Sequence, residues 1–151
     1  MKKRFLAALD LLKAEPSVNS EKLGAIGYCF GGAVVLNMAR EGVDLDGVVS
    51  FHGSLKTSRP AEPGRVNAAI LVLNGASDPF VTEEEKAAFT EEMDAAGVAY
   101  EFIDYPGVKH SFTNREATEI GRKFELPLEY NEAADSDSWE RMNAFLSRVF
   151  G

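Results

Sequence analysis

Four short apolar runs, each rich in strand-forming residues, constrain the fold more than any other feature of this sequence. They lie at residues 23–28, 46–51, 69–74 and 99–104, and the third contains the uninterrupted run Ile70-Leu-Val-Leu73. Runs that are apolar at nearly every position are typical of parallel strands buried on both faces, whereas half-buried strands alternate apolar with polar residues. The sequence therefore predicts four buried strands of a parallel sheet.

Segments with helical spacing flank and separate these runs. Near the amino terminus, Phe5, Leu9 and Leu12 recur at intervals that place them on one side of a helix. A charged residue, Asp10, interrupts the apolar stretch that a secretory signal peptide would need. The opening segment is therefore predicted to form an amphipathic helix.

Three more helices are predicted farther along the chain. One covers residues 30–40, and another is bounded by a Thr82–Glu85 capping box and by Gly97, a residue typical of helix ends. The last begins at about Asp137, and either Ser136 or Asp137 is a suitable cap. Its predicted buried stripe consists of Trp139, Met142, Leu146 and Val149.

The order of these segments predicts an α/β fold with three layers, in which a parallel sheet of about four strands is flanked by helices. A chain of 151 residues has the usual size of one domain, so residues 1–151 are predicted to form a single unit. Residues 53–68 and 105–134 contain most of the prolines and are expected to be loops.

The composition argues against several classes of function. A formal net charge of -8 disfavours nucleic acid as a partner, because phosphate binding relies on clustered lysine and arginine. No apolar stretch is long enough to cross a membrane as a helix. With one cysteine and two histidines, neither an internal disulfide nor a metal site is expected, and we expect a cytoplasmic protein without a cofactor.

The lone cysteine lies among glycines, between the first predicted strand and the helix that follows it. The segment Gly27-Tyr-Cys-Phe-Gly31 has the form Gly-x-nucleophile-x-Gly. This spacing is typical of a sharp turn that lifts the central side chain above the sheet, while glycines let strand and helix approach closely. The N–H group of Phe30 would open the helix and could donate to an oxyanion, and the helix dipole would favour the thiolate of Cys29.

Other interpretations of this segment are possible. A single cysteine is more often a small buried residue than a nucleophile. The glycines could belong to a phosphate-binding loop, but their spacing matches neither of the two common nucleotide-binding patterns. Residues at the ends of the later strands decide between these interpretations.

Two residues of suitable chemistry follow the later strands. Asp78 comes after the third strand, and His110 comes after the fourth. In a parallel sheet with helices on its faces, ligand-binding groups gather beyond the carboxyl ends of the strands. The order cysteine, aspartate, histidine therefore predicts that His110 exchanges a proton with the thiol and that Asp78 orients the imidazole.

Each of these residues also has a simpler interpretation. An aspartate before proline commonly starts a turn, which could be the only role of Asp78, and His110 could be a surface residue of a loop. His52 is the alternative base because it also ends a strand, but it precedes the candidate acid and is interpreted as a pocket or structural residue. Asp104 is a weaker candidate for the acid because it lies within or at the end of a strand.

The sequence resembles the dienelactone hydrolase family of α/β-hydrolases over essentially its whole length. The matching segments are Gly27-Tyr-Cys-Phe-Gly-Gly32, Asn74-Gly-Ala-Ser-Asp-Pro79, His110-Ser-Phe112, and Leu126-Pro-Leu-Glu-Tyr-Asn131 leading to Ser138-Trp139. The resemblance implies that Cys29, Asp78 and His110 form a catalytic triad that hydrolyses small esters or lactones through a thioester. The candidate pocket residues are Tyr28, His52, Phe80, Phe112 and Arg115, the last as a cationic anchor for an anionic substrate.

The match corresponds to the carboxyl-terminal half of the family's domain. Family members that this chain resembles carry additional amino-terminal strands, a second oxyanion donor and part of the substrate pocket. By this resemblance, residues 23–28 form an apolar sheet edge, which invites pairing with another chain. We expect either a homodimer through this edge or the adjoining apolar surface, or a truncated product.

Three functions follow as alternatives. The first is a cysteine hydrolase of small esters or lactones. The second is a weakly active or inactive half-domain that dimerises, and the third is a module that binds a small ligand without turnover. One oxyanion donor typically contributes about 3–4 kcal/mol to lowering the barrier, so a triad that lacks the second donor would be slow.

Overall fold

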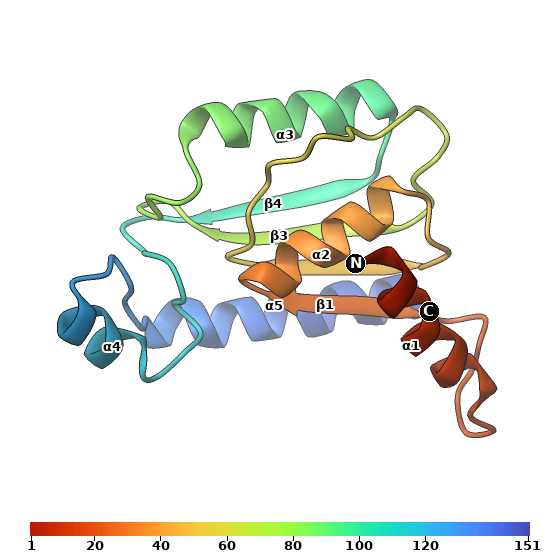
Figure 1. The fold of residues 1–151 in the computed structure, drawn as a ribbon, viewed down its shortest axis with the longest axis horizontal. Helices are drawn as coiled ribbons and strands as arrows, with labels where there is room; N and C mark the ends of the chain where they lie inside the picture. Colours follow the sequence, from red (N-terminus) through yellow and green to blue (C-terminus); the bar gives the residue numbers. More distant parts are fainter.

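The computed structural model describes residues 1–151, which form five helices and four strands (Figure 1). In chain order the elements are α1 Lys2–Ala14, β1 Gly24–Tyr28, α2 Phe30–Arg40, β2 Gly47–Phe51, β3 Ala69–Gly75, α3 Glu83–Ala96, β4 Tyr100–Tyr105, α4 Ala117–Phe124 and α5 Glu132–Phe150. All four predicted strands are present, and each end lies within about one residue of its predicted position.

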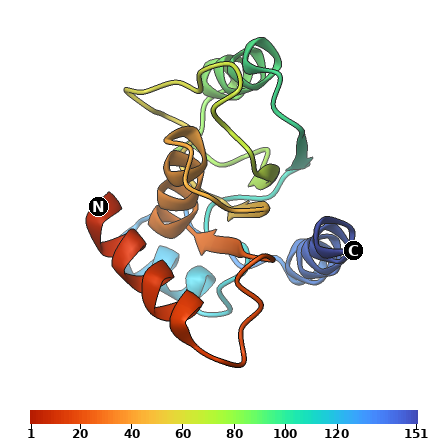
Figure 2. The same cartoon turned by 90° about the vertical axis from the view of Figure 1, so that its right-hand side faces the viewer.

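The strands form one parallel sheet in the order β1-β2-β3-β4, so neighbours in sequence are also neighbours in space. The register aligns Tyr28 at the end of β1 with Phe51 of β2, and Phe51 with Leu73 of β3. In Figure 2, α1, α2 and α3 lie on one side of the sheet and α5 lies on the other. The predicted three-layer α/β architecture is confirmed, and the segments after the strands emerge along one edge.

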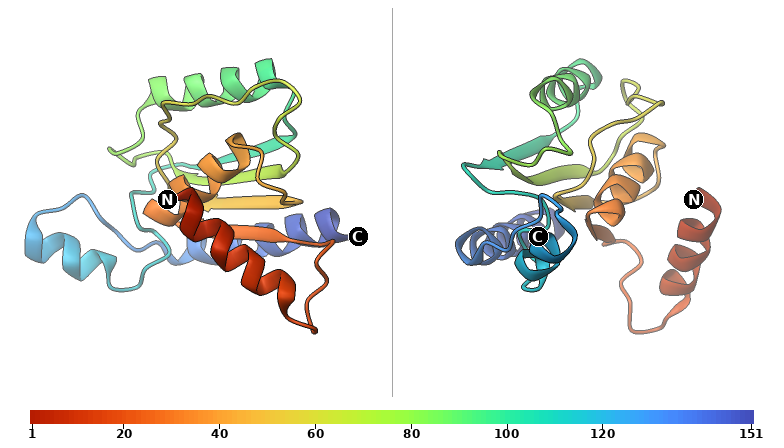
Figure 3. Two further views of the ribbon diagram at one scale, coloured as in Figure 1. Left: turned by 45° about the vertical axis from the view of Figure 1, so that its right-hand side comes forward. Right: turned by 60° about the vertical axis from the view of Figure 1, so that its left-hand side comes forward.

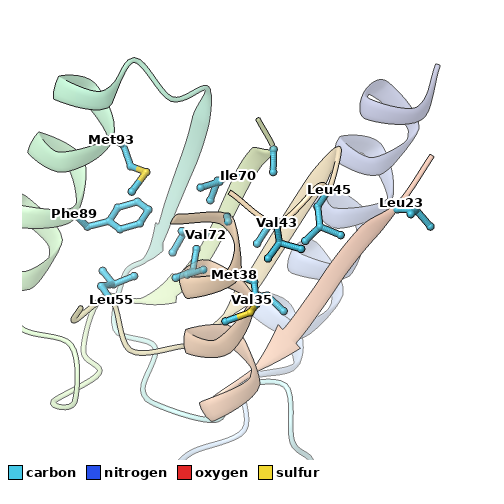
Figure 4. Packing of buried hydrophobic residues seen from close by; sticks show 14 of the residues in the cluster. Leu23, Val35, Met38, Val43, Leu45, Leu55, Ile70, Val72, Phe89 and Met93 are labelled. Atoms are coloured by element: carbon cyan, nitrogen blue, oxygen red, sulfur yellow. The ribbon is translucent and has the colours of Figure 1, made fainter. Parts of the chain in front are cut away.

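The core has two parts, one on each face of the sheet. Figure 4 shows the larger part, where Ile70 and Val72 of β3 meet Met38 of α2 and Phe89 of α3. The smaller part lies against α5 and contains Val49, Phe51, Leu71, Leu73, Met142 and Phe145. Successive residues of β2 and β3 therefore enter opposite halves of the core, which confirms that the central strands are buried on both faces.

The edge strands differ from this prediction because each has a neighbour on one side only. In β1, Ile26 is 44% exposed and Tyr28 is 39% exposed. In β4, Glu101 is exposed and the other residues are half-buried. The apolar runs at residues 23–28 and 99–104 thus form strands as predicted, but they are less buried than predicted.

The helix at residues 30–40 has the predicted bounds, and α3 has the predicted start and end. The side chain of Thr82 accepts a hydrogen bond from the N–H group of Glu85 at 3.3 Å, and Gly97 ends the helix with a φ of 66°. The side chain of Glu85 does not complete the capping box but pairs with Lys56 at 2.6 Å. A residue in the left-handed region is the usual end of a helix, which explains the glycine.

The last helix and the preceding loop correct two predictions. Helix α5 begins at Glu132 and not near Asp137, because the side chain of Asn131 accepts a hydrogen bond from Ala134 N–H at 3.0 Å. Trp139, expected in the buried stripe, is 52% exposed. The segment expected to be a loop contains α4, whose buried residues are the small Ala117 and Gly121. Ile120, half-buried, and Phe124, exposed, stand at helical spacing from them on the same side.

Helix α1 lies beside α2 and on the opposite side of the sheet from α5 (Figure 3). It reaches the core through Phe5, Leu6 and Leu9, whereas Leu12, expected on the same apolar side, is 44% exposed. None of the helices combines the length and the apolar character that a membrane crossing requires.

Candidate functional site

The turn between β1 and α2 holds Cys29 in a conformation that is rare for a residue with a side chain. Its φ is 53° and its ψ is -117°, and its thiol side chain is exposed. The Cys29 N–H group donates to Phe51 O at 3.0 Å, and the Cys29 carbonyl accepts from Ala33 N–H at 3.2 Å. The backbone is therefore fixed by the neighbouring strand on one side and by the first turn of α2 on the other.

Two glycines make this turn possible. A Cβ atom at Gly27 would lie 2.2 Å from the carbonyl group of Gly31, and one at Gly32 would lie 2.5 Å from the Ser50 hydroxyl oxygen. Both distances are far below a van der Waals contact, so a larger residue would push α2 away from the strands. The close approach of strand and helix that the glycine spacing predicts is present.

Phe30 is the first residue of α2, so its N–H group has no acceptor within the helix. That group lies next to Cys29 at the positive end of the helix dipole, which is suited to a developing negative charge. The phenyl ring of Phe30 is 69% exposed.

The structure brings the thiol, the imidazole and the carboxylate together. His110 Nε2 lies 3.3 Å from Cys29 Sγ, and His110 Nδ1 lies 2.7 Å from Asp78 Oδ2. The Asp78 side chain is fully buried, and its other oxygen accepts a hydrogen bond from Phe80 N–H at 2.8 Å. The aspartate thus starts a turn and also contacts the histidine, so the two interpretations of Asp78 are compatible.

Opposing effects act on the pKa of His110. Burial lowers the pKa, but the hydrogen bonds to Asp78 and Cys29 and the negative charge of Asp78 outweigh that effect and leave the pKa raised. The charged imidazolium is therefore favoured between these two partners. Such an imidazole can take a proton from the thiol and keep it.

His52, the alternative base, lies in the wall of the same region but points to a different partner. Its Nε2 lies 3.0 Å from the Thr113 hydroxyl oxygen, and its ring centre lies 5.1 Å from that of His110. Burial and the positive charge of His110 lower the pKa of His52 to about 4. His52 is thus neutral at neutral pH and does not contact the thiol, in agreement with its interpretation as a pocket or structural residue.

Replacing His52 is expected to change the pH dependence of stability. Its pKa is about 4 in the folded chain against a reference of 6.5, so the unfolded chain binds this proton more tightly. The contribution of this pKa difference to the free energy of unfolding is fully present above pH 6.5. It decreases by about 1.4 kcal/mol per pH unit as the pH falls from 6.5 toward 4. Between about pH 7 and pH 5, the free energy of unfolding should therefore fall by about 2 kcal/mol less in His52→Asn than in the original chain.

Urea unfolding at the two pH values measures this difference. Asparagine tolerates the positive φ of 39° at this position, so the substitution keeps the backbone conformation. Equal pH dependence in the variant and the original chain would contradict the assignment of a buried neutral imidazole.

A cavity of about 350 Å³ opens beside Cys29 and His110. Its lining residues are Cys29, Phe30, Ala33, His52, Ser54, Phe80, Val81 and His110. Two of the predicted pocket residues, His52 and Phe80, are among them. Ala33, Ser54 and Val81 were missed, although each lies within four residues of a predicted site residue or of the end of β2.

Three predicted pocket residues lie elsewhere. The Tyr28 ring stacks on Phe51, which belongs to the part of the core against α5. Phe112 is fully buried and packs edge-on against His52. Arg115 is exposed and lies beside Tyr130, so it does not provide a cation in the cavity wall.

Asp104, the weaker candidate for the acid, belongs to a separate polar cluster. Its carboxylate accepts hydrogen bonds from Asn74 Nδ2 and Lys86 Nζ, both at 2.8 Å. No group of three or more histidine, cysteine or acidic side chains is arranged to hold a metal ion.

Residues 1–150 match the sequence model of the dienelactone hydrolase family. The chain is 37% identical to uncharacterized protein K02A2.1 of Caenorhabditis elegans, with 99% of this chain and 94% of that protein covered. It is 32% identical to a Saccharolobus solfataricus protein with a carboxymethylenebutenolidase name, with 93% of this chain and 51% of that protein covered. The chain therefore spans about half the length of this second relative.

Solved structures similar to this chain also include members of the dienelactone hydrolase family. The chain is similar to the dienelactone hydrolase-like promiscuous phosphotriesterase P91 from metagenomic libraries, with a TM-score of 0.87 and 36% identity. That alignment covers 99% of this chain and 62% of P91. A dienelactone hydrolase of Klebsiella pneumoniae aligns with a TM-score of 0.74 at 22% identity, which supports the fold alone. By its fold and by a match along nearly all of its residues, the chain belongs to the dienelactone hydrolase family of α/β-hydrolases.

Proposed function

We propose that this chain hydrolyses esters or lactones of small molecules with Cys29 as the nucleophile. The observation that supports this most directly is the distance of 3.3 Å between Cys29 Sγ and His110 Nε2, with Asp78 on the other side of the imidazole. The exposed thiol faces a cavity of about 350 Å³, which is large enough for a small acyl group. The hydrolase names of the relatives agree with this reaction class.

In the first half of the reaction, His110 holds the thiol proton and the Cys29 thiolate attacks the carbonyl carbon. A C–S bond forms, and the carbonyl oxygen becomes an oxyanion that accepts a hydrogen bond from Phe30 N–H. The C–O bond to the leaving group then breaks, and His110 gives its proton to the departing oxygen. The product of this half is a thioester on Cys29.

In the second half, His110 takes a proton from water, and the resulting hydroxide attacks the thioester carbonyl. The C–S bond breaks, the acid is released, and the proton returns to the pair formed by Cys29 and His110. Asp78 keeps the imidazole in the orientation that both halves require and stabilises its positive charge. A lactone follows the same steps, with the leaving oxygen remaining attached to the acyl group.

Trapping the thioester tests this mechanism. After mixing with p-nitrophenyl acetate and quenching in acid, intact-mass and peptide analysis should find one acetyl group on the peptide that contains Cys29. The adduct should be removed by neutral hydroxylamine, because thioesters react with it readily. A steady release of p-nitrophenol without any acetylated Cys29 would contradict the covalent route.

We also propose that a second copy of the chain covers the free edge of β1. This strand pairs with β2 only, and its Ile26 and Tyr28 side chains are 44% and 39% exposed. Unpaired backbone groups beside exposed apolar side chains are a template for strand pairing. A dimer that forms no thioester would favour the alternative function, an inactive half-domain that associates through this edge.

Sedimentation equilibrium at micromolar concentration measures this association. The unmodified chain should be a dimer and Ile26→Lys a monomer, because a lysine on an edge strand opposes pairing. Phe124→Lys is the matched control, since Phe124 is 59% exposed on α4 and its replacement should leave the dimer intact. A monomeric unmodified chain would refute the proposed interface.

A further inference from the structure

We propose that the cavity beside Cys29 selects uncharged, apolar acyl groups and discriminates against acyl groups that carry a carboxylate. This inference rests on the proposed hydrolase function and specifies its substrate class. It differs from the sequence-based expectation that Arg115 anchors an anionic substrate.

The chemistry of the cavity wall carries the inference. Phe30, Ala33, Phe80 and Val81 supply most of the wall, and its exposed surface is almost entirely apolar. Ser54 is the only lining residue with an aliphatic hydroxyl group, and no lysine or arginine lines the cavity. A carboxylate that leaves water for this wall would lose its hydration without gaining a charged partner.

The charges nearest the cavity do not compensate for that loss. Any positive charge on His110 is already balanced by the Asp78 carboxylate at 2.7 Å. His52 is neutral, since burial and the charge of His110 lower its pKa to about 4. The pair formed by Cys29 and His110 shares one proton and is neutral overall, so the Asp78 carboxylate leaves the three groups with one net negative charge, which repels an anionic acyl group.

The cationic side chains nearest in sequence to the lining residues also lie outside the cavity. Lys56 follows Ser54 by two residues, but its ammonium group pairs with Glu85 at 2.6 Å and does not line the cavity. Arg115 is exposed beside Tyr130. The wall therefore offers no counter-ion from either flanking segment.

Two aromatic rings at the cavity determine what an apolar group would contact. Phe30 is 69% exposed and Phe80 is 50% exposed, although both line the cavity. The Phe80 ring packs edge-on against His110 with their centres 5.1 Å apart, so it lies directly beside the reacting atoms. Large aromatic surfaces left open to water beside a cavity are suited to an apolar ligand. We therefore assign Phe30 and Phe80 as specificity-determining residues.

A matched pair of substrates tests the selectivity. p-Nitrophenyl hexanoate and mono-p-nitrophenyl adipate have acyl chains of equal length that differ by a terminal methyl or carboxylate group. Relative to their uncatalysed rates, kcat/KM for the hexanoate should be higher by about tenfold or more. Equal values, or a preference for the adipate, would overturn the proposal.

A positive charge introduced at Phe80 should reduce or remove this difference. Phe80→Arg should raise the adipate-to-hexanoate ratio of kcat/KM by about tenfold, because it adds a counter-ion at a half-exposed position. Phe80→Met is the matched control, since it replaces the ring with an uncharged apolar side chain and should leave the ratio nearly unchanged. An equal change in both variants would contradict the electrostatic explanation.

Alkylation of Cys29 tests the cavity independently of ester hydrolysis. Iodoacetamide and iodoacetate are similar in size and differ in charge, and each rate is divided by the rate for the same chain unfolded in urea. Iodoacetamide should be favoured by about fivefold or more, whereas a normalised preference for iodoacetate would overturn the selectivity. If this preference is observed but neither ester forms a thioester, the hydrolase function fails while the selectivity of the cavity stands.

Discussion

Cys29→Ala is expected to abolish the burst of product from an activated aryl ester and to lower kcat by about three orders of magnitude or more. The alanine side chain cannot form the C–S bond, so only the weak contributions of the cavity and of Phe30 N–H remain. Stopped-flow absorbance of p-nitrophenol release measures both the burst and the steady rate. If the variant and the unmodified chain release product equally, Cys29 is not the nucleophile.

Two further measurements distinguish this loss from a loss of folding. Alanine requires the same backbone conformation at position 29 as cysteine does, so the melting temperatures of the two proteins should agree closely. His110→Gln, which keeps a polar side chain at the second position, should retain the thiol but slow acylation by about three orders of magnitude. A full burst in that variant would show that the thiol is activated by another group.

Arg40→Met is expected to lower the free energy of unfolding by about 3–5 kcal/mol, the usual loss when one partner of a buried ion pair is removed. The Arg40 side chain is 1% exposed and binds both carboxylate oxygens of Glu92 at 2.8 Å. It also donates to the carbonyl of Leu55 at 3.0 Å. Methionine fills much of the space but leaves the Glu92 carboxylate without its charged partner.

Two variants make the Arg40 prediction specific. The exposed pair of Arg65 and Glu62, with 46% and 69% exposed side chains, is the control, and Arg65→Met should cost less than about 1 kcal/mol. The double variant Arg40→Met with Glu92→Met should recover part of the loss, because it removes the unpaired charge. Urea denaturation measures all three, and an Arg40→Met loss no larger than that of Arg65→Met would contradict the role of this pair.

The ion pair also connects the core to the site. Glu92 accepts a hydrogen bond from Ala61 N–H at 2.6 Å, so the pair fixes the segment that leads from β2 to β3 at two points, Leu55 and Ala61. That segment begins with His52 and Ser54, which line the cavity. A loss of this pair should therefore loosen the cavity wall even where the sheet remains folded.

The parts of the fold that depend on local pattern could be predicted from the sequence. Each strand is marked by its own apolar run, and α3 is marked by Thr82 at its start and Gly97 at its end. Helix α4 was not predicted, because it is short and its close contact with the segment that follows depends on a glycine, which has no side chain. A Cβ atom at Gly121 would lie 2.5 Å from the Leu128 carbonyl oxygen, a contact that only the folded chain reveals.

In the candidate site, too, some features could be predicted from the sequence and others could not. The proximity of Cys29, Asp78 and His110 could be predicted because the residues that follow parallel strands lie at one edge of the sheet. The orientation of neighbouring side chains could not be found, since it depends on sheet register and on contacts between distant segments. Tyr28 adjoins Cys29 in sequence, yet its ring stacks on Phe51 away from the cavity, and the contact of His52 with Thr113 spans 61 residues.

The backbone conformation at position 29 affects which residues the fold accepts there without loss of stability. A φ of 53° with a ψ of -117° is comfortable for glycine, but it costs of order 1–3 kcal/mol for any residue with a Cβ atom. Selection for folding stability alone would therefore favour glycine there. A cysteine at this position therefore lowers the stability of the fold relative to glycine, which is consistent with the proposed role of its sulfur atom.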